Sequence, residues 1–186
     1  NNIFLNEKLL ARVKSIYDKK EQLNLSTEDA KLLEDLYESF KANGATLNKD
    51  DKEKYRKLSM DLSMLTLQFD QNALKDKNRF ELLITDENEL SGLPESARDA
   101  AAMLAKSKDK NGWLFNLSAP SYIPFMRYSD KRDLREKMYR EYMSVGNKGD
   151  EFDNKDIIKK IVNIRLEIAQ LMGFKNYAEY ALEHTM

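Results

Sequence analysis

Histidine is the side chain most often used for acid–base catalysis and zinc binding, and this sequence has one, His184. A catalytic zinc site needs three protein ligands, and the helical His-Glu-x-x-His arrangement needs two histidines. Cysteine is absent, which excludes thiolate catalysis, disulfides and cysteine-ligated metal. We therefore expect no catalytic residue and no metal ligand in this chain, and we interpret His184 as a surface or interdomain residue.

Acidic side chains gather at three places: Glu34 with Asp35, Asp50 with Asp51, and Glu151 with Asp153 and Asp156. Paired carboxylates can act as general acid and base where burial moves their pKa values apart. These carboxylates fall on polar helix faces or in a glycine-containing loop beside lysines. A solvated surface is therefore the favoured interpretation for all of them.

The stretch Ser107–Gly112 resembles the first half of a calcium-binding loop. Such a loop needs a bidentate glutamate at its twelfth position, where this sequence has Ser118, and a continuing helix, where it has Pro120. A polar turn leading into a strand is the better interpretation.

The segment 120–126, Pro-Ser-Tyr-Ile-Pro-Phe-Met, is the remaining candidate for binding. Two prolines around an aromatic residue make a rigid segment that could line a cleft, and Tyr122 could then offer its hydroxyl to a peptide. Phe125 and Met126 have the character of core residues, and prolines are common between a strand and a helix. The pattern favours a structural role, with Tyr122 as the one candidate substrate contact.

The chain that holds these side chains has 186 residues, of which 31 are lysine or arginine and 32 are aspartate or glutamate. The formal net charge of −1 argues against a dedicated nucleic-acid binder, because the basic surface of such a protein normally gives an excess of lysine and arginine over aspartate and glutamate. Hydrophobic residues make up 41%, enough for a core, and no apolar run approaches the ~20 residues of a membrane span. We expect no nucleic-acid partner and no membrane partner.

Three amphipathic helices are predicted first. One runs to about Leu23, and the second begins at Ser26, where Ser26–Asp29 resembles a capping box, and ends at Asn43 and Gly44. Asn48 is expected to cap the third helix. Its apolar residues recur every three or four positions: Tyr55, Leu58, Leu62, Leu65 and Phe69.

The middle of the chain predicts two strands, at 80–84 and 113–117, with a helix from Leu93 to about Lys106 packed over them. That helix is needed because a two-stranded sheet is marginal alone.

The last third predicts further helices. Asp130 is expected to cap one that runs to about Met143, apolar residues within 157–171 predict the next, which ends at Gly173, and a short helix follows Asn176.

These elements predict a mainly α, multi-helix fold with a small two-stranded β element. We expect 1–186 to be a single helical piece. Within it, residues 1–75 would form a helical wall, 76–128 a small α/β insert, and 129–186 the helices that follow.

Several segments, taken in order, resemble those of the thimet-oligopeptidase-like zinc metallopeptidases. The motifs are Leu93–Ser96, Trp113–Leu117, Pro120–Phe125, Leu134–Lys137, Tyr142, Gly146–Asn147, Asp153–Lys155, Ile161–Val162, Arg165–Leu166, Ala169–Phe174 and Asn176–Tyr180. The resemblance covers nearly the whole chain and is closest in detail to the bacterial peptidyl-dipeptidases, also called dipeptidyl carboxypeptidases.

The resemblance implies a large helical peptidase with a deep channel that admits short peptides. In that family a His-Glu-x-x-His helix and a further glutamate hold one zinc ion, and the peptidyl-dipeptidases release dipeptides from the C-terminal end. The motif is absent here and lies further along the chain in the family. The resemblance therefore implies an internal piece upstream of the zinc site, inactive alone, that forms part of the channel wall.

The remaining expectations concern partners and place. The parent protein would use zinc and short peptide substrates, whereas this chain would bind no cofactor and would self-associate weakly. The resemblance suggests the cytoplasm, with the periplasm as the alternative. From a different class, the periodicities also fit a stand-alone helical module that presents an amphipathic face to another protein.

Overall fold

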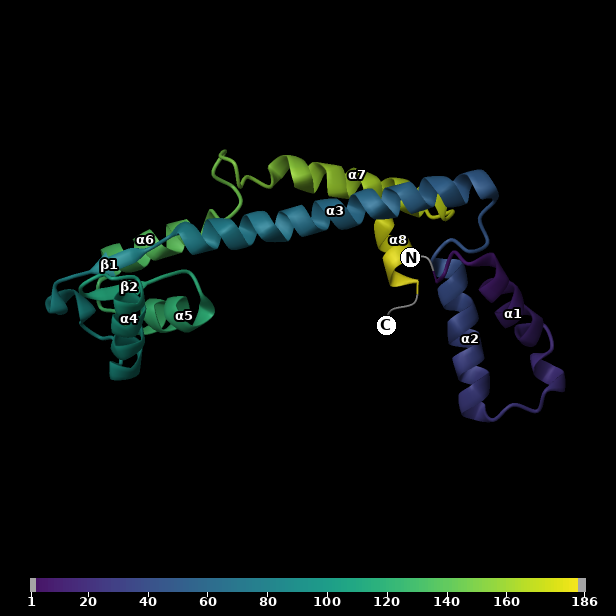
Figure 1. The fold of residues 1–186 in the computed structure, drawn as a ribbon, viewed down its shortest axis with the longest axis horizontal. Coiled ribbons are helices and arrows are strands. Elements are labelled where there is room, and N and C mark those ends of the chain that lie inside the picture. Colours follow the sequence, from purple (N-terminus) through teal and green to yellow (C-terminus); the bar gives the residue numbers. More distant parts are fainter. Residues whose placement is uncertain (1–2, 184–186) are drawn as a thin grey trace. The chain divides into compact units, whose positions relative to one another are not determined.

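A computed structural model describes residues 3–183 and divides the chain into two compact units (Figure 1). Unit 1 contains the residues up to Thr66 and those from Lys159 onward, and unit 2 is Leu67–Ile158. The elements in chain order are α1 (Glu7–Tyr17), the 3₁₀ turn η1 (Lys20–Gln22), α2 (Thr27–Ala42), α3 (Lys49–Arg79), β1 (Leu82–Ile84), the 3₁₀ turn η2 (Glu87–Leu90), α4 (Glu95–Ser107), β2 (Trp113–Phe115), α5 (Ala119–Tyr128), α6 (Arg132–Met143), α7 (Lys155–Leu171) and α8 (Tyr177–Leu182).

The predicted fold class, mainly helical with a small two-stranded element, is confirmed. The division at residues 75 and 128 stays a prediction. No helix among residues 3–183 is long and apolar enough to cross a membrane.

In unit 1, α1 and α2 form a hairpin around a small apolar cluster that includes Val13, Leu33 and Phe40. The first helix is shorter than expected, since α1 ends at Tyr17 rather than near Leu23. The Tyr17 ring stacks on that of Tyr37 in α2, with centroids 4.1 Å apart, so the chain must turn back soon after this contact.

The predicted N-caps Ser26 and Asn48 are confirmed. Ser26 Oγ accepts a hydrogen bond from the backbone N–H of Asp29, as an N-cap does, and donates one to the Asp29 carboxylate in place of the backbone bond that would complete a capping box. Asn48 Oδ1 likewise accepts from the backbone N–H of Asp51 at 2.9 Å. Gly44, with φ +80°, follows the end of α2 in the left-handed conformation that a helix exit needs.

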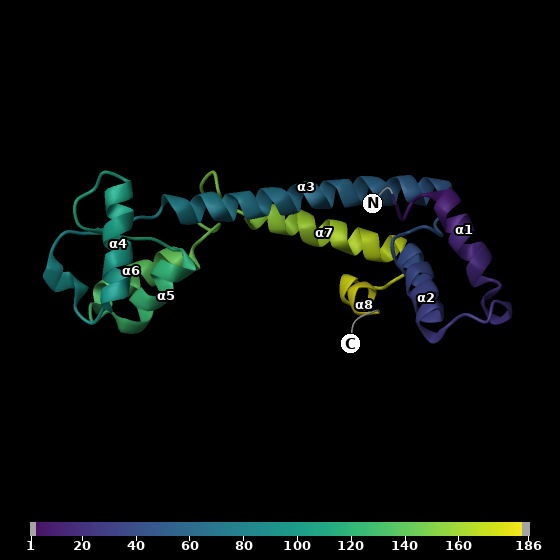
Figure 2. The ribbon, with the colours of Figure 1, turned by 60° about the horizontal axis from the view of Figure 1, so that its bottom comes forward.

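The second cluster of unit 1 joins α3 to α7 and α8. Tyr55 and Leu58 of α3 are buried against Ile168 of α7, and the Tyr180 hydroxyl donates a 2.8 Å hydrogen bond to the Ala42 carbonyl. Figures 1 and 2 both show α7 alongside the first part of α3. Alternation of three and four residues places one face of each helix toward the other.

Unit 2 is built on the predicted two-stranded sheet, which is antiparallel. The strands pair with Leu82 opposite Phe115, Leu83 opposite Leu114 and Ile84 opposite Trp113. Each strand is three residues long, shorter than predicted. The helices α4, α5 and α6 add side chains to the same core cluster, which contains Phe80, Leu82, Ile84, Leu90, Leu93, Ala101, Phe115, Leu117, Phe125 and Met138.

The proline segment lies within the helix α5. Pro120 occupies the second position of α5, where the missing N–H would be unbonded in any case, so it favours helix initiation. Pro124 lies inside the same helix.

Asp130 does not cap α6, contrary to our expectation. Its carboxylate accepts a 2.6 Å hydrogen bond from Ser91 Oγ, and its N–H bonds to the Ser91 carbonyl, so it joins two loops instead. Lys131 holds the cap position without a side-chain bond.

The loop between α6 and α7 is held to α3 by buried polar side chains. The fully buried Asp76 carboxylate accepts a 2.8 Å hydrogen bond from the Gly146 N–H and pairs with Arg79 at 2.7 Å and Lys148 at 3.2 Å. Asn154, exposed by only 2%, donates to the Phe69 carbonyl. These hydrogen bonds offset the free-energy cost of burying the Asp76 carboxylate and the Asn154 amide.

Candidate functional site

Tyr122, the predicted substrate contact, lies on α5 at the edge of the unit 2 core. Its half-buried ring stacks on Tyr142 of α6, with centroids 4.3 Å apart and an interplanar angle of 17°. The Lys77 ammonium lies 5.2 Å from the centre of the Tyr142 ring. The ring of Tyr122 is therefore fixed in position by packing.

The hydroxyl of Tyr122 is the part of this residue that is free for recognition. Burial raises the pKa of the Tyr122 phenol, and the neighbouring Tyr142 and Tyr139 add to the increase. A phenol with a raised pKa stays protonated and so keeps its donor. Among residues 3–183 the hydroxyl has no hydrogen-bond partner, and it could donate to a peptide carbonyl.

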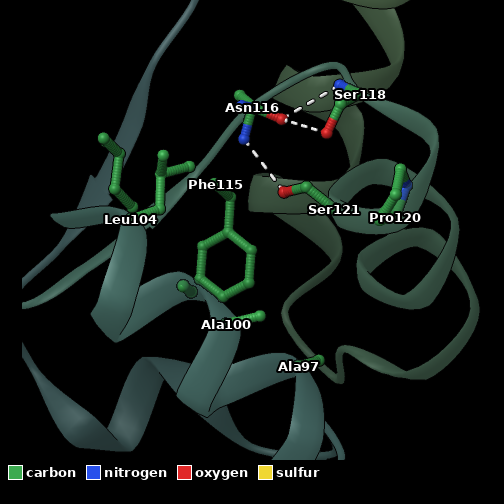
Figure 3. A pocket seen from close by; sticks show the side chains of 10 residues that line it. Ala97, Ala100, Leu104, Phe115, Asn116, Ser118, Pro120 and Ser121 are labelled. Carbon is green, nitrogen blue, oxygen red and sulfur yellow. Dashed lines mark hydrogen bonds between the residues drawn. The ribbon is translucent and has the colours of Figure 1, made fainter. Parts of the chain in front are cut away.

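A pocket of about 220 Å³ opens beside this segment, between α4 and the connection from β2 to α5 (Figure 3). Small and apolar side chains form its walls, and three polar residues form its rim. The lining residues are Ala97, Ala100, Ala101, Leu104, Leu114, Phe115, Asn116, Ser118, Pro120 and Ser121.

The polar rim is occupied by its own hydrogen bonds. Asn116 Oδ1 accepts from the N–H of Ser118 at 3.0 Å and from its hydroxyl at 2.6 Å, and the Asn116 N–H donates to Ser121 Oγ at 3.0 Å (Figure 3). These bonds hold the turn into α5 in shape. The pocket could therefore receive a small apolar side chain, while its rim carries no chemistry of its own.

Two of the acidic residues singled out from the sequence, Asp35 and Asp153, are held by lysines close to them in the sequence. Asp35 pairs with Lys31 at 2.5 Å, and the pKa of Asp153 is lowered mainly by the hydrogen bond from the Lys155 N–H. In the part of the chain that the structure describes, no group of three or more histidine, aspartate or glutamate side chains could hold a metal ion. His184 lies outside the described residues, so its expected role stays a prediction.

Sequence reasoning missed the buried carboxylate of Asp76. Asp76 stands among other charged residues in the sequence, a pattern typical of a solvent-exposed helix face. Those neighbours are indeed exposed or half-exposed, so the pattern gives no sign that Asp76 itself is buried. Its partners Gly146 and Lys148 lie 70 and 72 residues away in the sequence, so only the folded chain brings them together.

The comparisons with known proteins point to a class of peptidase. Residues 125–186 match the model of Peptidase family M3. The match begins at Phe125, after Tyr122 and after the residues that line the pocket.

Particular relatives agree with that class. The chain is 38% identical to Probable cytosolic oligopeptidase A of Arabidopsis thaliana, over 93% of this chain and 26% of the relative. It is 36% identical to Oligopeptidase A of Salmonella typhimurium, over 97% of this chain and 27% of the relative. It is 33% identical to Dipeptidyl carboxypeptidase of Escherichia coli, over 100% of this chain and 28% of the relative.

This chain is a homologue of the family M3 peptidases, which confirms the resemblance found in the sequence. It spans about a quarter of the length of the curated relatives that it matches. The choice between the dipeptidyl carboxypeptidases and oligopeptidase A stays a prediction.

Proposed function

We propose that this chain is a non-catalytic part of a zinc-dependent peptidase that hydrolyses short peptides, and that the chain is inactive alone. The observation that carries the proposal is the family M3 match over residues 125–186, together with similarity to oligopeptidases over most of the chain. The parent enzyme would lie in the cytoplasm, in keeping with the name of the Arabidopsis relative.

Zinc would be held by other parts of the parent enzyme. Residues 3–183 offer no group of three potential ligands, and the sequence has a single histidine and no cysteine. A catalytic zinc needs three protein ligands and activates water for attack on the peptide bond. The side chains of this chain would instead shape the access of the peptide.

Within that role, Tyr122 is the proposed substrate contact. Its ring is fixed by Tyr142, and its protonated hydroxyl is free to donate to a peptide carbonyl. We propose that it lines the substrate channel of the parent enzyme.

The product pattern has two candidates. The sequence motifs predict release of C-terminal dipeptides, as the name of the Escherichia coli relative describes. The higher identity to oligopeptidase A favours cleavage of oligopeptides without that restriction. Both candidates share a short peptide as substrate.

The alternative from another class is a helical module that binds a partner protein through an amphipathic face. It predicts function without zinc and without turnover. The expected weak self-association of the chain fits either proposal, as does our expectation that it has no nucleic-acid partner and no membrane partner.

A paired assay with metal analysis separates these proposals. The 186-residue chain and the full-length gene product are each given a blocked tripeptide with a free C-terminus and a longer blocked peptide, with and without chelator. We expect stoichiometric zinc and chelator-sensitive hydrolysis in the long form alone. Dipeptide release favours the carboxypeptidase pattern and internal cleavage the oligopeptidase pattern.

Two outcomes would count against the proposal. Zinc binding and turnover by the short chain would contradict its inactivity. Inactivity of both forms would favour the interaction module.

The role of Tyr122 is tested in the full-length enzyme by Tyr122→Phe, which keeps the ring and removes the hydroxyl. The matched control is Tyr128→Phe, at the exposed end of α5. Loss of one hydrogen bond to substrate predicts about a tenfold fall in kcat/KM for the first variant alone. Equal activity of both variants would remove Tyr122 from the substrate contacts.

A further inference from the structure

Helix α3 carries a second apolar stripe that nothing in the described chain covers. Met60, Met64, Leu67 and Leu74 are exposed by 61%, 69%, 58% and 59%. These residues belong to one continuous helix, Lys49–Arg79, so the stripe is a property of α3 itself.

The spacing of the stripe is that of a helix-packing seam. The intervals from Met60 to Met64 and Leu67 are four and three residues, and Gln71 occupies the next position before Leu74. Alternation of four and three keeps side chains on one face for several turns, which is the pattern that one helix offers another.

This stripe lies on the opposite side of α3 from the buried one. Tyr55, Leu58 and Leu62 face the cluster that α3 shares with α7. At about 100° per residue, Met60 and Met64 point roughly away from that face. A helix with apolar residues on two opposite faces is typical of the interior of a larger helical protein, packed on both sides.

Single exposed apolar residues are ordinary, whereas a row of four at regular spacing forms a patch. The methionine side chains at the start of the stripe are flexible, so they can adapt to an uneven surface on a partner helix. Aspartates at 61 and 70 flank the stripe, and Lys75 flanks its far end, so charge as well as shape is available for matching a partner.

We propose that the stripe Met60–Met64–Leu67–Leu74 is the docking surface for an apolar helix face from the rest of the parent peptidase. The proposal rests on the proposed function. Its occupant is chosen because the relatives are about four times as long as the part that this chain matches. A segment of the same polypeptide also docks at high effective concentration, which an unlinked second copy lacks.

Methionine oxidation tests the proposal without any substitution. The 186-residue chain and the full-length protein are treated with hydrogen peroxide, and oxidation of each methionine is followed by mass spectrometry. Met60 and Met64 should react quickly in the short chain and about tenfold more slowly in the full-length protein, because oxidation follows exposure. Met138, fully buried in unit 2, is the internal control and should be slow in both.

Two results would overturn the proposal. Equal rates for Met60 and Met64 in the two proteins would show that the stripe faces solvent in the parent. Protection in the short chain that grows with its concentration would show that a second copy covers the stripe.

A pair of variants gives a second, independent readout. Met64→Glu places a charge in the stripe, and Thr66→Glu places one at an exposed position two residues later, on the opposite side of the helix from Met64. Both should leave the thermal unfolding of the short chain unchanged, whereas Met64→Glu alone should lower the Tm of the full-length protein by several degrees. Equal Tm values for the two full-length variants would contradict the proposal.

The outcome is separate from that of the proposed function. Zinc content and turnover are read from the wild-type full-length protein, and the stripe is read from oxidation and Tm. A zinc peptidase with an exposed stripe refutes the docking surface alone. A full-length protein without zinc or turnover refutes the proposed function, whatever the stripe does.

Discussion

The two units differ in how completely they enclose their cores. In unit 2, six of the ten buried members of one cluster are exposed by 1% or less, among them Phe115, Phe125 and Met138. In unit 1, the eight buried members of two smaller clusters are exposed by 1–9%, and of these Phe40 alone is as low as 1%. Unit 2 wraps its core with a sheet and several helices, whereas the clusters of unit 1 are shared among a few helix faces.

This difference in burial indicates that unit 2 can enclose its apolar core by itself, whereas the clusters of unit 1 are less completely enclosed by this chain alone. Unit 2 combines an enclosed apolar core with fully bonded buried polar groups, of which Asp76 is the clearest. Exposed apolar side chains occur in both units, for example Leu32 at 66% in unit 1 and Met103 at 72% in unit 2, so the units differ in their cores and not in their surfaces. We infer that unit 2 supplies most of the stability of the isolated chain.

The largest effect is expected from Phe125→Ala. This ring is fully buried and meets Phe115 edge to face, with centroids 4.8 Å apart. Its removal leaves a cavity and should lower the free energy of unfolding of unit 2 by about 4 kcal/mol. Trp113 is the single tryptophan and lies in unit 2, so its fluorescence during urea unfolding reports this unit.

The matched control is Phe40→Ala in unit 1, another buried ring with an edge-to-face partner, Phe4. It should reduce helicity measured by circular dichroism and leave the Trp113 transition in place. If Phe40→Ala moves the Trp113 transition as far as Phe125→Ala does, the two units unfold together and the comparison fails.

The next largest effect is expected from Asp76→Ala. Removing the carboxylate leaves the buried Gly146 N–H without its partner and takes from the partly buried Lys148 one of its two carboxylate partners, the other being Glu141, which together should cost about 3 kcal/mol. Asp70→Ala, at an exposed position of the same helix, should change stability by less than about 0.5 kcal/mol. Similar values for the two variants, measured by Trp113 fluorescence, would show that the buried network adds little.

Local rules predicted much of the fold from the sequence. The caps at Ser26 and Asn48 and the left-handed exit at Gly44 depend on neighbouring residues alone, and all are present. The pairing of the two strands followed from their being the only two candidates, whereas their antiparallel orientation comes from the structure.

Contacts distant in sequence were not predictable in the same way. Asp130 looked like a cap because its local sequence permits one, but Ser91 lies 39 residues away and takes the carboxylate instead. The second stripe on α3 was not predicted. Met60 and Leu67 lie in the sequence between residues of the first stripe, the one that faces α7, so the first stripe alone was recognised. Tyr122 could be selected as a candidate from the sequence alone. Its stacking on Tyr142 could not be predicted, because the two residues lie on different helices that only the folded chain brings together.

A smaller effect is expected at the glycines of the loop that Asp76 holds. Gly146 has φ +68°, and a Cβ there would lie 3.0 Å from Nδ2 of the buried Asn154. Gly149 has a similar φ of +73° but open space around its Cβ position. Gly146→Ala should therefore cost about 2 kcal/mol and Gly149→Ala about 1 kcal/mol, since both pay backbone strain and the first also crowds a neighbour. Equal losses in urea unfolding would show that strain alone matters.

The smallest effect is expected from Glu81, which lies just before β1 at the edge of the unit 2 core. Its carboxylate pairs with Lys108 and Lys110, and hydrogen bonds from these lysines hold the pKa of Glu81 below its ordinary value of 4.5. A lowered pKa in the folded state means that the ionised form stabilises the fold. The contribution is present above pH 4.5 and is lost as the pH falls through the lowered pKa.

Glu81→Gln tests this contribution. Because the pair is partly solvated, the variant should be less stable than the wild type by under about 1 kcal/mol at pH 7. The difference should shrink as the pH falls below 4.5 and in 1 M salt, which screens exposed charges. A difference that persists at low pH and high salt would mean that Glu81 acts through packing, and would extend the enclosed core of unit 2 to its charged edge.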